Sequence, residues 1–274
     1  MTHTRRDHLR HLVGALSAAA LPVRGATADF AAWSDAQKEN FLKTSKIESS
    51  REIGHGVTKP VQVELALGAI RHSAKVQVVD KELPDFFCAD GKPVPMRDAW
   101  RFNVATYRID RLLDLRMVTV VVPRTFRGKA AGFSWWVDDV QFEEVERIKR
   151  EIQPHDPEDF ERQRALVRVF DELIINIDRN LSNLLITKSW KLALIDHSRC
   201  FTPYHGIRNE ANLGRCSRKL LDQMRKLTAA AAQQAAGTHL TRAEVAALMA
   251  RRDRIVASFE KAASEKGEEN VLFS

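Results

Sequence analysis

Three polar residues in the second half of the chain follow one another at spacings that constrain the fold most strongly. Asp178 comes first, Asn183 follows five residues later, and Asp196 follows after thirteen more. Upstream of Asp178, apolar residues recur at three- and four-residue steps, which is typical of one face of a helix. Short apolar runs at 184–186 and 192–195 predict a strand hairpin. The three polar side chains are therefore expected together, where a helix and a hairpin end.

This order of residues favours phosphoryl transfer. In such a site an acid accepts the proton of a substrate hydroxyl, an Asn five residues on binds magnesium, and an Asp beyond a hairpin holds magnesium against the phosphates. The sequence thus predicts Asp178 as the base and Asn183 and Asp196 as Mg²⁺ ligands. The alternative is an Asx turn after the helix, with Asp196 capping the next segment.

The same residues carry a resemblance to a known superfamily. Asp178-Arg-Asn-Leu-Ser-Asn183, followed by Leu194-Ile-Asp196, resembles the Asp-Arg-His-x-x-Asn and Ile-Asp motifs of the atypical kinase-like superfamily. Its members include phosphatidylinositol kinases, HipA-type kinases and secretory-pathway kinases. In patches the likeness extends over residues 50–205, including a small-lobe helix near 100–113. It implies an α+β, two-lobe protein-kinase-like fold with ATP and Mg²⁺ as cofactors.

Two departures from that pattern keep a second interpretation open. Asn103 falls where many of these families carry a Glu that pairs with the lysine that positions ATP. His197 and Ser198 replace the Phe-Gly or Asn-Gly that usually follows the metal-binding Asp. The alternative function is therefore a catalytically inactive, pseudokinase-like module that binds a nucleotide or a partner.

Candidate phosphate-binding residues lie in the first third of the chain. Gly54 and Gly56 precede a strand pattern and are assigned to a loop that covers the phosphates, although glycines also suit an ordinary hairpin turn. A second strand, at 74–79, carries Lys75, which is the favoured lysine for the phosphates. Lys59 is a weaker alternative.

A further strand pattern begins at Lys129 and ends in an acidic turn, which in a kinase body would be the hinge between the lobes. Adenine would be held there by backbone groups between apolar walls. Trp135 or Trp136 could line that pocket, or both could belong to the core. We assign Trp136 to the nucleotide site.

The remaining segments carry weaker patterns. Helices are expected within 29–50 and over 98–114, 208–228 and 241–266, the last with a capping box at its start. A loop is expected at 84–98, a strand at 118–122, and a solvated, charged face at 139–164. Residues 229–237 are interpreted as a helix end or a link between helices.

The N-terminus resembles a bacterial twin-arginine export signal. Arg5 and Arg6 precede an apolar run at 12–21 and small residues that end at Ala28. The predicted organisation is an export signal at 1–28 and a kinase-like domain at 29–274, with a small lobe at about 45–135 and a large lobe at about 136–274. The protein would then be exported to the periplasm or beyond. The alternative is an amphipathic helix and a cytoplasmic protein.

Composition limits the classes of partner. A chain of 274 residues with 29% charged residues is not expected to span a membrane. The net charge of +7 favours anionic ligands. Aromatic residues make up only 7% and do not alternate with the basic runs, so no specific nucleic-acid partner is expected. The expected partners are a nucleotide and an unknown hydroxyl-bearing substrate. The three cysteines do not form a metal motif.

Overall fold

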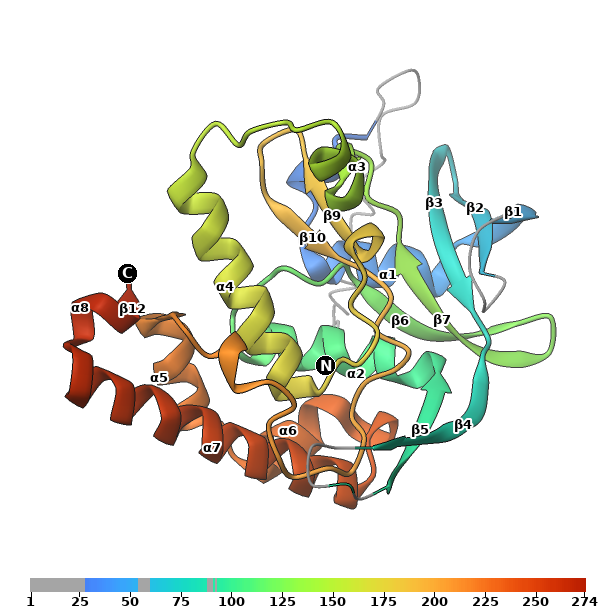
Figure 1. The fold of residues 1–274 in the computed structure, drawn as a ribbon. Coiled ribbons are helices and arrows are strands. Elements are labelled where there is room, and N and C mark those ends of the chain that lie inside the picture. Colours follow the sequence, from blue (N-terminus) through green and yellow to red (C-terminus); the bar gives the residue numbers. More distant parts are fainter. Residues whose placement is uncertain (1–27, 54–59, 88–90, 92) are drawn as a thin grey trace, which may run out of the picture.

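A computed structural model describes residues 28–53, 60–87, 91 and 93–274 (Figure 1). Gly54, Gly56, Lys59, Cys88 and residues 1–27 of the predicted export signal lie outside this description. A large sheet with two helices against it forms one part of the molecule. Longer helices and a small sheet form the other part (Figure 1).

The large sheet is antiparallel throughout, with the strand order β1-β2-β3-β7-β6. Its strands are β1 Lys46–Glu52, β2 Val61–Leu67, β3 Ile70–Gln77, β6 Val121–Phe126 and β7 Lys129–Trp135. In β3, the buried residues His72, Ala74 and Val76 alternate with the less buried Ser73 and Lys75, because successive side chains of a strand point to opposite faces. The strands expected near 61, 74 and 129 are thus confirmed, whereas the strand expected at 118–122 begins at 121.

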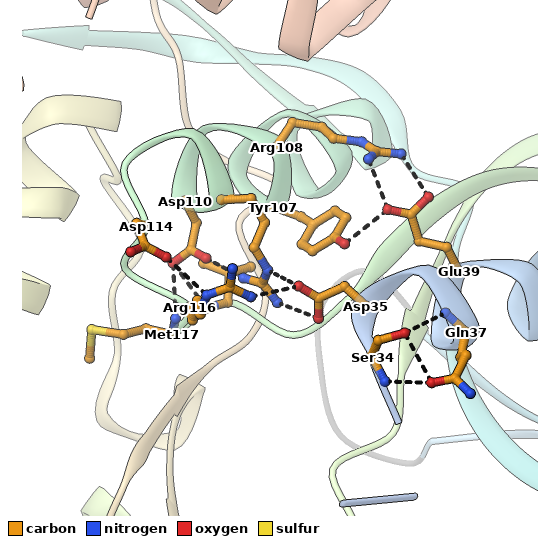
Figure 2. Close-up of polar contacts among 12 residues, drawn as sticks. Ser34, Asp35, Gln37, Glu39, Tyr107, Arg108, Asp110, Asp114, Arg116 and Met117 are labelled. Atoms are coloured by element: carbon orange, nitrogen blue, oxygen red, sulfur yellow. Dashed lines mark hydrogen bonds and ion pairs between the residues drawn. The ribbon is translucent and has the colours of Figure 1, made fainter. Parts of the chain in front are cut away.

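Two helices pack on this sheet, α1 (Asp35–Thr44) and α2 (Trp100–Leu112). They are joined by hydrogen bonds and ion pairs: Glu39 accepts hydrogen bonds from the Tyr107 hydroxyl at 2.9 Å and from the Arg108 guanidinium at 2.8 Å (Figure 2). Asp35 pairs with Arg111 at 2.7 Å. On its other side α2 contacts the C-terminal helices. The helix expected at 98–114 is confirmed, and it connects the two parts of the molecule.

Two strands lie where the sequence predicted other structure. The segment expected to be a loop at 84–98 belongs to a hairpin of β4 (Asp80–Phe87) and β5 (Pro93–Ala99). A register shift between Leu83 and Phe86 accommodates Pro84 within the strand pair. The helix expected within 29–50 is confirmed as α1, but β1 overlaps the end of that region, and all of its residues are exposed, so it has no apolar alternation to reveal it.

The second part begins with β8 (Val140–Glu143), α3 (Glu144–Lys149) and α4 (Pro157–Ile174). The expected hairpin is confirmed as β9 (Leu184–Thr187) and β10 (Leu192–Leu194), and β8 extends it to three strands. The expectation of a solvated face at 139–164 was wrong in part. Glu144 and Arg147 are buried and satisfy each other as an ion pair.

The C-terminal segments pack against α2 and α4. They are η3 Glu210–Asn212, β11 Cys216–Ser217, α5 Arg218–Lys226, α6 Ala229–Ala236, η4 Gly237–His239, α7 Arg242–Lys266, α8 Glu268–Val271 and β12 Leu272–Phe273. The capping box at Thr241 and Glu244 is confirmed. The helix expected from 208 begins only at Arg218, and α6 is a separate helix because the Thr228 side chain caps it.

A buried cation holds α7 in place. Arg251 has no exposed surface and donates to the carbonyl oxygens of Leu173 (2.8 Å), Thr202 (3.3 Å) and Tyr204. Burial lowers its pKa to about 9. Arg251 thereby ties α7 to the end of α4 and to the segment that follows Asp196.

No helix of the described residues is both long and apolar enough to cross a bilayer. Cys200 and Cys216 are buried free thiols. Burial raises the pKa of both, that of Cys216 to about 12, so these thiols are not activated nucleophiles.

Candidate active site

A cavity of about 550 Å³ lies between the large sheet and the segments around β9 and β10. Lys75 of β3 and Trp136, which follows β7, line it from the sheet. Asp178, Asn183 and Asp196 line it from the other part of the molecule. Five of the seven residues assigned to the site from sequence therefore meet at one cavity. Their chemical roles stay predictions.

The two tryptophans at the end of β7 occupy different environments. Trp135 is buried and stacks on His72, with ring centroids 3.7 Å apart, so it belongs to the core as well as to the cavity wall. Trp136 is half-buried at the cavity, and its backbone amide donates to the carbonyl of Ser73. Trp135 is thus a core residue that also lines the cavity, and Trp136 lines the cavity only; contact of either ring with adenine stays a prediction.

The segment before Asp178 is shaped by polar side chains. α4 ends at Ile174, and its C-cap residue Ile175 adopts a left-handed conformation with φ of 48°. Asn176 then accepts a hydrogen bond from the backbone amide of Asp178 at 3.1 Å and donates its own amide to the buried Asp171 at 3.1 Å. The Asx turn here is made by Asn176. The Asp178 carboxylate is left facing the cavity.

Arg179 joins this segment to the one that carries Asp196. Its guanidinium pairs with Asp171 at 2.9 Å and donates to the carbonyl oxygens of Asn183 and Ile195, both at 3.2 Å. It also lies 2.8 Å from Nε2 of His197. Burial, with Arg179 and Lys75 nearby, lowers the pKa of His197 far below its usual value. The imidazole is therefore neutral, and Nε2 can accept a hydrogen bond from Arg179.

Asp196 is the most heavily bonded of the predicted ligands. Its Oδ2 lies 3.1 Å from Nζ of Lys75, and its Oδ1 accepts from Gln77 at 2.9 Å and from Ser198 at 3.5 Å. Burial alone would raise the pKa of Asp196, but Lys75 and the hydrogen bonds outweigh burial, so the pKa is lowered. Asp196 is therefore a carboxylate at neutral pH, in the state that a metal ion requires.

Asn103 has a defined role in place of the missing Glu. It is buried on α2, donates to Oε1 of Gln77 at 3.0 Å and accepts from the backbone amide of His197 at 2.8 Å. Hydrogen bonds between neutral amide groups thus link α2, β3 and the segment around Asp196. Lys75 is held by Asp196 instead of by an acid on α2.

Three residues of this site were missed in the sequence. Gln77 carried a signal, because it stands two positions after Lys75 in the same strand and so faces the same way. Arg199 and Asp98 carried none, because their ion pair of 3.0 Å joins positions 101 residues apart. Arg199 also pairs with Asp178 at 3.1 Å.

The surroundings of Asp178 raise the pKa of its carboxyl group. Burial raises its pKa above the usual Asp value, the nearby carboxylates of Asp196 and Asp98 add to that rise, and Arg199 and Arg179 oppose it. A carboxylate with a raised pKa is a better proton acceptor than an ordinary Asp.

A divalent metal has few clustered protein ligands in the described part of the chain. It contains no group of three or more His, Cys, Asp or Glu residues suited to hold a metal. The two predicted ligands, the carboxylate of Asp196 and the amide oxygen of Asn183, line the cavity together with the carboxylates of Asp178 and Glu143. Hard oxygen ligands of this kind suit Mg²⁺, which is commonly held by one or two carboxylates together with the phosphates of a substrate. The residues present therefore fit the predicted ion.

No protein-family model matches the chain, and neither does any curated protein sequence. Solved structures do match. A Fam20 protein of hydra, solved with a sugar, superposes with a TM-score of 0.64 at 12% identity, over 87% of this chain and 91% of that one. The Golgi casein kinase with Mn and ADP bound superposes with a TM-score of 0.59 at 12% identity, over 87% of this chain and 78% of that one. The Helicobacter pylori proinflammatory kinase CtkA superposes with a TM-score of 0.51 at 10% identity, over 83% of this chain and 98% of that one.

At identities of 10–12%, the likeness establishes the fold. The chain has an atypical kinase-like fold of the α+β class, with a sheet-containing lobe and a mainly helical lobe. The predicted fold class is confirmed.

Proposed function

We propose that this protein is an ATP- and Mg²⁺-dependent phosphotransferase that moves the γ-phosphoryl group of ATP to a hydroxyl of a protein, lipid or small molecule. The observation that carries the proposal is the meeting of Lys75, Asp178, Asn183 and Asp196 at one cavity in a kinase-like fold. The Golgi casein kinase, which shares this fold, was solved with Mn and ADP. That complex supports a nucleotide and a divalent cation as ligands here.

Each residue has a role that its position allows. Lys75 binds phosphate oxygens, Trp136 and the backbone after β7 hold the adenine, and Asp178 takes the proton of the acceptor hydroxyl. Asn183 and Asp196 would hold Mg²⁺, which neutralises charge on the phosphates when bound. Gly54 and Gly56 are proposed to cover the phosphates, on the strength of the sequence.

A binding titration tests this proposal directly. The full chain is titrated with ATP by calorimetry, with Mg²⁺ and then with a chelator. We expect saturable binding of one nucleotide that weakens strongly when the metal is removed. An absence of ATP binding under both conditions would contradict the proposed function.

Lys75 provides a second test, because only a nucleotide with a full triphosphate should reach its ammonium. Lys75→Met is expected to weaken ATP binding by roughly 1.5–3 kcal/mol, the value of one charge-assisted contact, and to weaken AMP binding much less. Lys129→Met, at an exposed position of β7, is the matched control and should change neither affinity. Equal losses for ATP and AMP in Lys75→Met would remove Lys75 from the phosphate site.

A binding module without catalysis is the second candidate function. Asn103 favours it, because the neutral amide chain from Asn103 through Gln77 leaves Lys75 without an acidic partner on α2. The carboxylate of Asp196 then has to serve both as the partner of Lys75 and as a metal ligand. Binding of ATP with magnesium, without turnover, would support this alternative.

We also propose that the boundary between the lobes lies near residue 135, where β7 ends.

On the basis of the twin-arginine pattern, we further propose that the protein is exported to the periplasm or beyond. The secreted protein is expected to begin at about Asp29, immediately before the 3-10 helix η1 (Phe30–Ala32). Exchange of Arg5 and Arg6 for Lys should retain the precursor inside the cell. N-terminal sequencing of the exported protein checks the cleavage site and the export signal. An intact Met1 on the exported protein would contradict both.

A further inference from the structure

Arg199 stands between two carboxylates that differ in their exposure. Its Nε lies 3.0 Å from Oδ2 of Asp98, and its Nη1 lies 3.1 Å from Oδ2 of Asp178. The Asp98 side chain has no exposed surface, whereas that of Asp178 is 47% exposed. Arg199 and Asp178 both line the cavity, whereas the buried Asp98 is not among its lining residues.

The buried end of this arrangement is firmly anchored. Asp98 is at the end of β5, where the neighbouring amide of Ala99 donates to the carbonyl of Ser198 at 2.8 Å. Within the described residues, Oδ1 of Asp98 is buried and has no hydrogen-bond partner. A buried carboxylate that is not fully hydrogen-bonded is costly unless a cation compensates it. Asp98 therefore holds Arg199 strongly, and the rest of the guanidinium is presented to Asp178.

We propose that Asp98 and Arg199 are positioning residues for the base: Arg199, fixed by Asp98, holds Oδ2 of Asp178 and leaves Oδ1 free for the acceptor hydroxyl. This inference rests on the proposed function. As the acceptor oxygen bonds to the γ-phosphorus, its proton passes to Oδ1 of Asp178, the bond from the γ-phosphorus to the bridging oxygen breaks, and ADP leaves with that electron pair. Arg199 takes no proton, because partial burial lowers its pKa but the hydrogen bond to Asp98 and the nearby carboxylates outweigh burial and raise it.

The arrangement predicts two pH shifts of opposite sign. The charged groups that surround Asp178 or share its cavity are Arg199, Arg179, Asp196, Asp98, Lys75 and Glu143. Among them Arg199 lowers the pKa of Asp178, and Asp98 raises it. A base works when it is ionised, so activity rises with pH through its pKa. Loss of Arg199 should therefore move the acidic limb of the pH profile upward, and loss of the Asp98 charge should move it downward.

The experiment compares Arg199→Gln, Asp98→Asn and the wild-type full chain. One readout is the pH dependence of kcat for hydrolysis of Mg·ATP, with water as the acceptor. The other is the titration of the Asp178 carboxyl carbon by NMR, assigned with Asp178→Asn. We expect a shift of about one pH unit upward for Arg199→Gln and a smaller downward shift for Asp98→Asn. Both variants should lower kcat more than they change KM for ATP.

Two further variants separate charge from geometry. Arg199→Lys keeps the cation but loses the two-pronged guanidinium, so the pKa of Asp178 should return toward the wild-type value while kcat stays low. Arg127→Gln, in the turn between β6 and β7, is the control and should shift nothing. If Asp98→Asn does not fold, the comparison of Arg199→Gln with Arg199→Lys still decides the question. Unshifted titrations of Asp178, or shifts of the same sign in Arg199→Gln and Asp98→Asn, would overturn the proposal.

Failure of this inference can be distinguished from failure of the proposed function. If the wild-type protein neither binds nor hydrolyses ATP, the proposed function fails. The NMR titration needs no turnover, and it still shows whether Asp98 and Arg199 control the ionisation of Asp178. If ATP is hydrolysed with unshifted profiles in both variants, only the positioning role is wrong.

Discussion

Replacement of Asp196 with Ala is expected to abolish magnesium-dependent binding of ATP. The carboxylate is the only acidic ligand that we assign to the metal, and a methyl group cannot replace its charge. The same change leaves Lys75 and Gln77 without their shared acceptor, so the phosphate side of the site is also disturbed. Calorimetric titration with ATP and Mg²⁺ measures the effect.

The matched control for that experiment is Asp222→Ala, which removes an exposed carboxylate from α5. It should bind ATP like the wild type. Unchanged affinity in Asp196→Ala would show that the metal site has been assigned wrongly.

Asp178→Ala should have the opposite signature, with nucleotide binding nearly intact and turnover strongly reduced. The expected loss in kcat is about 10²–10⁴-fold, the usual range when a general base is removed. The raised pKa of Asp178 and its exposure at the cavity support a role in proton transfer rather than in metal binding. An equal loss of ATP affinity would mean that Asp178 is a ligand.

The parts of the site that could be predicted from sequence are local ones. Asp178, Asn183 and Asp196 belong to one run of helix, loop and hairpin, so their spacing alone indicates that they meet. Lys75 could be selected because a strand pattern surrounds it. The fold class followed from these local patterns together with the family resemblance, and the solved kinase structures confirm it.

The parts that were missed depend on contacts between distant segments. The partner of Lys75 is 121 residues away, and an isolated sequence contains no signal for that pair. The same holds for Asp98 and Arg199. β1 was missed for a different reason: it is held by backbone pairing with β2 while its side chains stay exposed, so hydrophobic periodicity is absent.

Lys75 and a metal ion are expected to compete for the carboxylate of Asp196. The ammonium of Lys75 lies where it neutralises Asp196, and the amide groups of Gln77 and Asn103 offer it no alternative anion. In the proposed function, a nucleotide would supply phosphate oxygens for Lys75 and would so free Asp196 for the cation. ATP and magnesium are therefore expected to bind together, each strengthening the binding of the other.

The most direct test of the central claim is the formation of ADP from γ-labelled Mg·ATP by the full chain, measured beside Asp178→Ala and with hydroxyl acceptors of the protein, lipid and small-molecule classes. We predict ADP and a labelled acceptor with the wild type, and a loss of both in Asp178→Ala. Binding of Mg·ATP without ADP above background for any acceptor, including the protein's own serines, would contradict the phosphotransferase and leave a nucleotide-binding module.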